Sequence, residues 1–201
     1  MSNLVMIAGL GNPGKEYAFT RHNAGWWWVN NLAENYAAKF KENTKLKGWL
    51  AKTIIEEQEC LLFKPSSYMN ESGLPIRLVS EYYQIPLDKI LVVHDEMAFS
   101  PGTVKIKFGG GSNGHNGLKS LFTELSNNQG FYRLRIGVGH PGQAHMVTPY
   151  LTKQKIPVEE RKLINDSLDF SSELLREIVN GCWNEAMNKL HVQRPIDENL
   201  S

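Results

Sequence analysis

Residues 4–25 read LVMIAGLGNPGKEYAFTRHNAG and carry an apolar run into a segment that contains several glycines. The run LVMIAGL predicts a buried strand, because short apolar segments bounded by glycine are typical of strands in a sheet core. Gly9, Gly11 and Gly14 satisfy the pattern G-x-G-x-x-G, which in many α/β proteins binds the phosphates of a nucleotide. The stretch therefore raises the question of whether it is a phosphate-binding turn.

Three features argue against a nucleotide site. Pro13 lies inside the motif, where it removes an N–H donor and disfavours helical backbone at Asn12. The helical pattern resumes only after Asn23, so no helix begins within the glycine motif. Glu16 stands where a P-loop needs a serine or threonine, and its carboxylate would repel phosphate. We therefore interpret the segment between the strand LVMIAGL and the helix after Asn23 as a loop at the end of a strand, where α/β folds place their sites.

The rest of the chain alternates predicted strands and helices. Apolar or β-branched runs predict five more strands, at residues 49–56, 59–65, 89–96, 103–108 and 132–139. Helical spacing of apolar residues predicts helices over about 24–40 and 72–83, just after Asn116, and beyond Pro157 with a break at Gly181. This alternation predicts a single three-layer α/β/α domain over residues 1–201, with a mixed, mostly parallel twisted sheet and a frayed tail at about 192–201.

The composition bounds the class of protein. No apolar run approaches the roughly 20 residues that span a bilayer, so we expect no membrane contact. The amino terminus lacks a secretory pattern, and the two cysteines, Cys60 and Cys182, suggest no disulfide framework, so we expect a cytoplasmic protein. A net charge of +1 excludes a globally basic nucleic-acid binder but allows a local basic patch.

His22 and Asp95 are the first candidates for chemistry. His22 precedes a predicted helix, and Asp95 lies near the end of the predicted strand 89–96. A carboxylate there can hold an imidazole in one tautomer and stabilise its charged form, which suggests a base that activates water. A solvated strand end with a helix or turn cap is the competing interpretation. The other histidines, His115 among them, match no metal-binding spacing, so we expect no metal.

A second glycine-rich loop, FGGGSNGHNG at residues 108–117, lies between a predicted strand and a predicted helix. It could bind an anion at the start of that helix or let a backbone approach a substrate closely. Ser112 in this loop also satisfies the serine-hydrolase pattern G-x-S-x-G, and Asp166 or Asp169 with His191 would complete a triad. A serine hydrolase is therefore an alternative to water activation.

Basic side chains flank this second loop. Alternation along a strand places Lys105 and Lys107 on one face, and it places Arg133 and Arg135 on one face of the following strand. An isolated sheet edge of this kind would simply be solvated. Because these residues bracket a glycine-rich loop, they fit better a local patch that contacts phosphate groups.

Four motifs in order resemble those of the bacterial-type peptidyl-tRNA hydrolase family: GLGNPGKEYAFTRHNAG, PSSYMNESG, VVHDEMAFSPGTVKIKFGGGSNGHNGLKSL and RLRIGVGHPG. The match runs over nearly the whole chain and ends with AMNKLH. The resemblance implies a monomeric α/β domain without cofactor or metal, which cuts the ester bond between a peptide and the 3′-terminal ribose of tRNA. The implied partner is the acceptor end and 3′-terminal adenosine of peptidyl-tRNA from chains that left the ribosome early.

The resemblance also implies roles for single residues. His22 matches the base that acts on water, and Asp95 matches the residue that orients it. Residues that bind substrate or line the site are implied to be Asn12, Tyr17, Met69, Asn70 and Asn116. Lys107 and Arg135 match residues that hold the tRNA 5′-phosphate, and Lys105 joins them as a phosphate contact in the same patch. Taken by itself, Asn70 fits a helix cap as well as a substrate contact.

Two further points follow from the resemblance. Some relatives serve in RNA splicing, so a non-catalytic RNA-binding protein is another hypothesis, which the presence of His22, Asp95 and Asn12 disfavours.

The segment HMVTPYLT carries Pro149 within residues 140–152, where the resemblance implies a mobile lid.

Overall fold

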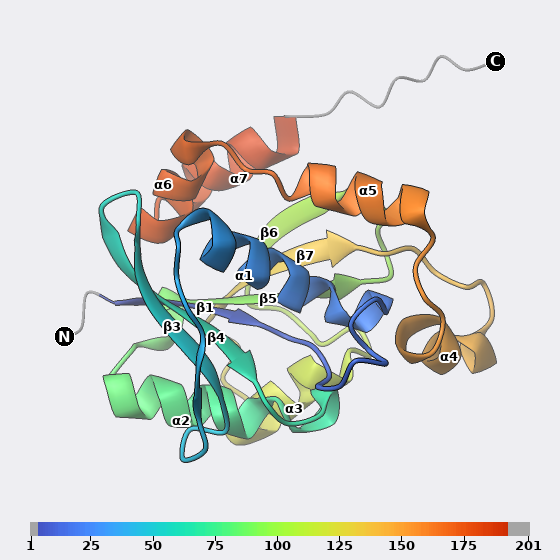
Figure 1. The fold of residues 1–201 in the computed structure, drawn as a ribbon, viewed down its shortest axis with the longest axis horizontal. Helices are drawn as coiled ribbons and strands as arrows, with labels where there is room; N and C mark the ends of the chain where they lie inside the picture. The colour runs from blue at the N-terminus through green and yellow to red at the C-terminus, as the bar shows by residue number, and fades with distance from the viewer. Residues whose placement is uncertain (1–3, 193–201) are drawn as a thin grey trace.

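Seven strands form one sheet in the order β2-β3-β4-β1-β5-β7-β6 (Figure 1). The computed structural model describes residues 4–192. The strands are β1 (Val5–Gly9), β2 (Lys41–Asn43), β3 (Gly48–Ile55), β4 (Gln58–Pro65), β5 (Ile90–Glu96), β6 (Val104–Phe108) and β7 (Tyr132–Gly137). The six predicted strands are all present, and β2 is a strand that the sequence does not predict.

The centre of the sheet is parallel and its edges are antiparallel. Strands β4, β1, β5 and β7 pair in parallel. The pairs β2 with β3, β3 with β4, and β6 with β7 are antiparallel. Strands β1 and β5 are buried along their whole length, as parallel strands are when helices cover both faces. The predicted mixed sheet is confirmed, with three parallel and three antiparallel strand pairs.

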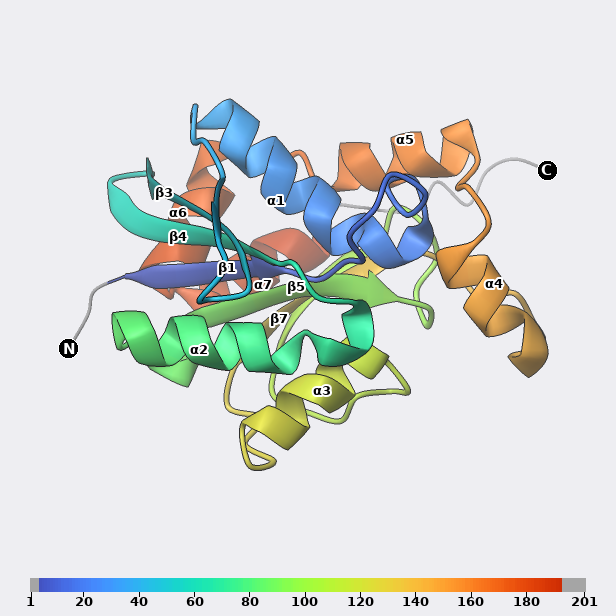
Figure 2. The same ribbon diagram turned by 60° about the horizontal axis from the view of Figure 1, so that its bottom comes forward.

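Helices cover both faces of the sheet (Figures 1 and 2). One face carries α1 (Ala24–Asn35), α5 (Val158–Ser167), α6 (Ser172–Asn180) and α7 (Trp183–Val192), and the other carries α2 (Gly73–Tyr83) and α3 (Asn116–Glu124). Each helical layer has its own buried apolar cluster, with Trp28 and Ile178 in the first and Ile76 and Leu121 in the second. The predicted three-layer α/β/α architecture is therefore confirmed. None of the helices within residues 4–192 combines the length and apolar character needed to cross a membrane.

Two helix ends differ from the prediction. Helix α1 ends at Asn35 rather than Phe40, because Ala37 adopts a left-handed backbone with φ of 51°, which closes the helix. Helix α7 includes Val192, which the sequence assigns to a frayed tail. Residues 193–201 of that predicted tail lie outside the described residues.

The segment with Pro149 forms a short helix that the sequence does not predict. Helix α4 (Val147–Thr152) follows the 3₁₀ turn η4 (Ala144–Met146). Pro149 is the third residue of α4, where a backbone N–H has no partner inside the helix, so the proline costs no hydrogen bond there.

The end of β1 and the start of α1 approach each other closely. A Cβ atom at Gly25 would lie 2.3 Å from the carbonyl oxygen of Val93 in β5, and one at Gly9 would lie 2.6 Å from the carbonyl oxygen of Gly25. Glycine at both positions lets the start of α1 pack directly against β1 and β5. The 3₁₀ turn η1 (Arg21–Asn23) thereby brings His22 to the end of β5.

Candidate active site

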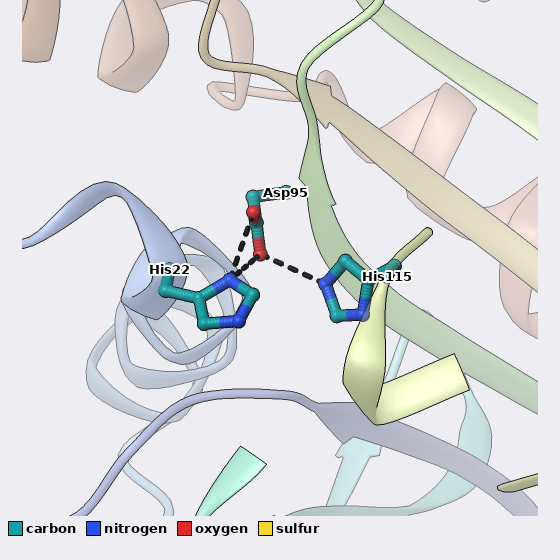
Figure 3. A group of neighbouring side chains, drawn as sticks. All are labelled: His22, Asp95 and His115. Atoms are coloured by element: carbon teal, nitrogen blue, oxygen red, sulfur yellow. Dashed lines mark hydrogen bonds and ion pairs between the residues drawn. The ribbon is translucent and has the colours of Figure 1, made fainter. Parts of the chain in front are cut away.

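His22 and Asp95 are in direct contact (Figure 3). Nδ1 of His22 lies 2.8 Å from Oδ1 and 2.9 Å from Oδ2 of Asp95, and the two residues are 5% and 2% exposed. Because an ionised carboxylate can only accept hydrogen bonds, Nδ1 of His22 carries the hydrogen. Nε2 of the neutral ring therefore keeps a lone pair that can take a proton from water.

A second histidine shares the same carboxylate. Nε2 of His115 donates to Oδ1 of Asp95 at 3.0 Å. Nδ1 of His115 accepts from the backbone N–H of Leu118 at 3.4 Å, which makes His115 the N-cap of α3. Since Nδ1 accepts, the hydrogen of neutral His115 is on Nε2, and the loop before α3 is tied to the end of β5.

Charge and burial shift the protonation of this cluster. Burial lowers the pKa of His22, but the charge of Asp95 and the hydrogen bond to it outweigh burial and leave that pKa above its ordinary value. Burial raises the pKa of Asp95, but the two histidines hold it far below its usual range. Burial, with His115 nearby, lowers the pKa of His94 to about 3, so His94 stays neutral. The cluster therefore pairs an ionised carboxylate with a strengthened base.

His22 lines a cavity of about 100 Å³. Its walls come from the end of β5, from the loop before α3 and from α4, through residues that include Glu96, Ser112, Asn116 and Thr148. This volume holds a few water molecules, at about 30 Å³ each, or one ester group. Asn116 thus lies in the same cavity as His22, and its role in binding substrate stays a prediction.

Asn12 joins two loops of the site. Its Oδ1 accepts from the backbone N–H of Met69 at 2.7 Å. Its backbone N–H donates to Oδ1 of Asn23 at 2.8 Å, and its carbonyl accepts from Nδ2 of Asn23 at 3.0 Å. Asn12 and Met69 are both buried, so these bonds fix the loop after β1 against the turn after β4.

Tyr17 and Asn70 lie outside the His22 cavity. The ring of Tyr17 packs edge-on against Tyr68, with 6.3 Å between centroids. Asn70 is exposed and lines a separate hollow of about 450 Å³ between α2 and α3, together with Lys47 and Glu124. Neither residue therefore lines the cavity that contains His22, and their predicted contact with substrate stays a prediction.

The basic residues form a separate pocket next to the His22 cavity. Lys107, Arg133 and Arg135 line a hollow of about 400 Å³, here called the basic pocket, together with Glu96, Gly111, Ser112, Asn113 and Leu118. The antiparallel register pairs Lys107 with Arg133 and Lys105 with Arg135. Lys105 is exposed, stacks over the ring of Phe99 at 5.0 Å and does not line the pocket.

Arg133 holds the second glycine-rich loop in place. Its guanidinium donates to the backbone carbonyls of Gly109, Gly110 and Gly111. Burial lowers the pKa of Arg133 to about 10, which leaves it charged at neutral pH. Arg133 therefore fixes the wall of the basic pocket, while Lys107 and Arg135 present cations to it.

The hydroxyl of Ser112 has no histidine partner in the described structure. Ser112 lines both the His22 cavity and the basic pocket, but no hydrogen bond joins its side chain to a histidine within residues 4–192. Asp166, a proposed triad member, pairs with Lys162 on the exposed side of α5 at 3.4 Å. The side chain of His191 lies outside the described residues. The structure thus gives the serine-hydrolase alternative no support.

One side-chain group within residues 4–192 could hold a metal ion. The ligand atoms of His22, Asp95 and His115 all lie within 4.8 Å of one another. A metal ion there would have to replace the hydrogens that both histidines donate to Asp95, and it would occupy the side of His22 that orients the ring.

The sequence interpretation misses three residues of the site. His115 binds Asp95, Asn23 holds the loop of Asn12, and Glu96 lies between the cavity and the basic pocket. The position of His115 just before a predicted helix is a signal for a cap, but its bond to Asp95 depends on how β5 and the loop meet in space. Glu96 follows Asp95 directly in sequence, so its acidic character alone does not distinguish it from a solvated strand end.

Comparison with known proteins gives consistent matches over nearly the whole chain. A family model described as peptidyl-tRNA hydrolase matches residues 6–199. Proteins named peptidyl-tRNA hydrolase from Marinomonas sp. (strain MWYL1) and Yersinia pestis bv. Antiqua (strain Antiqua) are each 44% identical over 191 residues, covering 95% of this chain and 98% and 97% of theirs. The crystal structure of peptidyl-tRNA hydrolase from Acinetobacter baumannii is similar, with a TM-score of 0.89, 40% identity and 96% coverage of both chains. A complex of a peptidyl-tRNA hydrolase with N-propanol gives a TM-score of 0.90 at 40% identity, covering 97% of this chain and 98% of that one.

Proposed function

The chain belongs to the peptidyl-tRNA hydrolase family, and we propose that it hydrolyses the ester bond between a peptide and the 3′-terminal ribose of peptidyl-tRNA. The observation that carries the proposal is the buried pair of His22 and Asp95, with a 2.8 Å contact, in a cavity large enough for water and an ester group. Asn116 lines the same cavity.

His22 acts on water in this proposal. Nε2 takes a proton from the water molecule as its oxygen attacks the ester carbonyl carbon. The tetrahedral intermediate then breaks the bond to the ribose oxygen, and that oxygen takes the proton from Nε2, leaving a free peptide acid and a tRNA hydroxyl. Asp95 stabilises the imidazolium between the two steps and keeps Nδ1 protonated.

Side chains and water suffice for this reaction. An ester is an activated acyl group, and a positioned base contributes about 10²- to 10⁴-fold. The amide of Asn116 is the proposed donor to the developing oxyanion, since it lies in the cavity at the start of α3. No covalent intermediate with Ser112 is needed.

Substrate contacts extend the proposal beyond the cavity. Asn12, Tyr17, Met69 and Asn70 would position the peptide and the 3′-terminal adenosine. Lys107 and Arg135 in the basic pocket, with Lys105 beside them, would contact the 5′-phosphate of the acceptor end. We further propose that the protein acts as a cytoplasmic monomer without metal or cofactor and returns tRNA and peptide for recycling after early release from the ribosome.

The decisive comparison uses N-acetyl-aminoacyl-tRNA and unblocked aminoacyl-tRNA. We expect release of the acyl group from the N-blocked substrate and much slower release from the unblocked one. Ser112→Ala should retain activity and the wild-type protein should not react with an organophosphonate probe. Binding of tRNA without cleavage of either ester would contradict the proposal and favour an RNA-binding role, whereas an inactive Ser112→Ala variant with a labelled wild type would favour a serine hydrolase.

A further inference from the structure

Glu96 lies between the two hollows of the site. It is the last residue of β5, directly after Asp95, and it is 6% exposed. It lines both the His22 cavity and the basic pocket. A buried carboxylate needs partners on every lone pair, so the groups that it binds show what it connects.

One oxygen of Glu96 holds the loop that forms the cavity wall. Oε1 accepts from Nδ2 of Asn113 at 3.0 Å and from the backbone N–H of Ala98 at 3.0 Å. Asn113 has a left-handed backbone with φ of 46°, in a turn closed by the N–H of His115 donating to the carbonyl of Ser112 at 2.9 Å. His115, which donates to Asp95, and Asn116 follow in the chain. The position of Asn113 therefore fixes part of the cavity wall.

The other oxygen of Glu96 holds the arginine of the basic pocket. Oε2 accepts from Nε of Arg135 at 3.1 Å and from Nη2 of Arg135 at 3.0 Å. This contact uses one edge of the guanidinium, and Nη1 on the opposite edge can donate to an anion. The guanidinium also lies over the ring of Phe99 at 4.4 Å, so two groups set its orientation.

Glu96, Ser112 and Asn113 line both pockets, and Glu96 is the buried one of the three. An anion in the basic pocket attracts Arg135, and any shift of the guanidinium acts on Glu96 through two hydrogen bonds. Glu96 passes that shift to Asn113 through Oε1. We propose that Glu96 is a positioning residue, through which a phosphate group bound in the basic pocket increases the rate of reaction at His22. This inference rests on the proposed function.

Two substitutions break the contact of Glu96 with Arg135 and its contact with Asn113 one at a time. Glu96→Gln keeps an oxygen that can accept from Ala98 and Asn113, but its amide nitrogen would face the donors of Arg135, so it breaks the arginine side. Asn113→Gly removes the donor on the loop side and tolerates the positive φ without strain. Glu56→Gln is the matched control, because Glu56 also pairs with an arginine, Arg176 at 3.0 Å, and it lines neither pocket.

The experiment measures kcat and KM for N-acetyl-aminoacyl-tRNA that carries either a 5′-phosphate or a 5′-hydroxyl. In the wild type and in Glu56→Gln, loss of the phosphate should raise KM and lower kcat, the latter by about 5-fold or more, a typical lower bound for coupled sites. In Asn113→Gly, loss of the phosphate should still raise KM but leave kcat unchanged. In Glu96→Gln, loss of the phosphate should change both KM and kcat less than it does in the wild type. Thermal unfolding of each variant identifies general loss of fold.

The outcomes distinguish the inference from the proposed function. A phosphate effect on KM alone in the wild type would overturn the role of Glu96, as would a kcat effect that persists in Asn113→Gly. If neither kcat nor KM depends on the 5′-phosphate, the basic pocket does not bind that phosphate, and the inference is overturned. Absence of hydrolysis from every substrate would instead contradict the proposed function.

Discussion

His115 donates a hydrogen bond from Nε2 to Oδ1 of Asp95, 3.0 Å away, on the same oxygen that accepts from His22. One carboxylate therefore binds two imidazoles. In the proposed function His22 keeps Nε2 for a proton from water, whereas His115 uses both ring nitrogens, one on Asp95 and one on the N–H of Leu118. Asp95 is held from two sides, and its negative charge is shared between them.

Removal of His115 should strengthen the base while it loosens the carboxylate. In His115→Ala, Asp95 loses one donor, so its charge acts more fully on His22, and the pKa of His22 should rise further. The low-pH limb of the kcat/KM profile should then move to higher pH, and kcat should fall less than in His22→Ala. His115→Asn restores a good N-cap for α3, which separates the cap from the bond to Asp95. An unchanged pH profile in both variants would show that His115 serves only the helix.

The pH profile of the wild type follows from the raised pKa of His22. A general base must be neutral, so kcat/KM should rise with pH through a pKa above the ordinary value of histidine. Asp95→Asn removes the charge that raises this pKa, and burial then lowers it, so the limb should move to lower pH. The plateau should also fall, but by less than in His22→Ala, because the imidazolium loses its counter-charge and the ring its fixed tautomer. A limb that moves upward in Asp95→Asn would contradict the assigned pair.

Two substitutions at Asn12 separate its structural bond from its predicted contact with substrate. Asn12→Ala leaves the N–H of Met69 without its buried acceptor, which should cost about 1–3 kcal/mol of unfolding free energy. Asn12→Asp keeps an acceptor for the N–H of Met69 and replaces only Nδ2, so any loss of stability then reports the burial of the new carboxylate. If Nδ2 binds substrate, Asn12→Asp should still lower kcat/KM. Chemical denaturation tests the structural bond, and turnover of N-acetyl-aminoacyl-tRNA tests the contact with substrate. Full activity of Asn12→Asp would show that Nδ2 does not bind substrate.

The close contact of α1 with the sheet predicts a sharp difference between two glycines. A Cβ atom at Gly25 would meet the carbonyl oxygen of Val93 at 2.3 Å, whereas one at Gly111 meets nothing within 4 Å. Gly25→Ala should therefore destabilise the fold by about 2 kcal/mol or more, since strand backbone must move, and it should displace His22. Gly111→Ala should leave stability within about 0.5 kcal/mol. Equal unfolding midpoints for the two variants would contradict the packing described for the start of α1.

Much of the fold is readable from sequence because the elements carry local signals. The strand β5 begins with the apolar run ILVV at residues 90–93, and Pro13 and Glu16 argue against a phosphate-binding turn after β1. The end of α1 is not readable in this way, since Tyr36 and Phe40 continue the helical spacing after the chain has left the helix at Asn35. The short strand β2 shows no alternation of apolar and polar residues, and it forms because it pairs with β3.

The site is only partly readable for a related reason. A histidine before a helix and an aspartate near the end of a strand suggest a pair, but the link of His115 to Asp95 depends on where the second glycine-rich loop lies. The same holds for Glu96, whose partners Asn113 and Arg135 come from a loop and from β7. Such contacts are set by packing across the sheet, and a pattern along the chain does not contain them.

Single-turnover hydrolysis of N-acetyl-aminoacyl-tRNA by His22→Ala tests water activation by His22 most directly. The variant should fold like the wild type, as circular dichroism and thermal unfolding would establish. Its rate of acyl release should fall by about 10²-fold or more, because the base that deprotonates water is missing. A folded His22→Ala protein that releases the acyl group at close to the wild-type rate would contradict the assignment of His22 as the base.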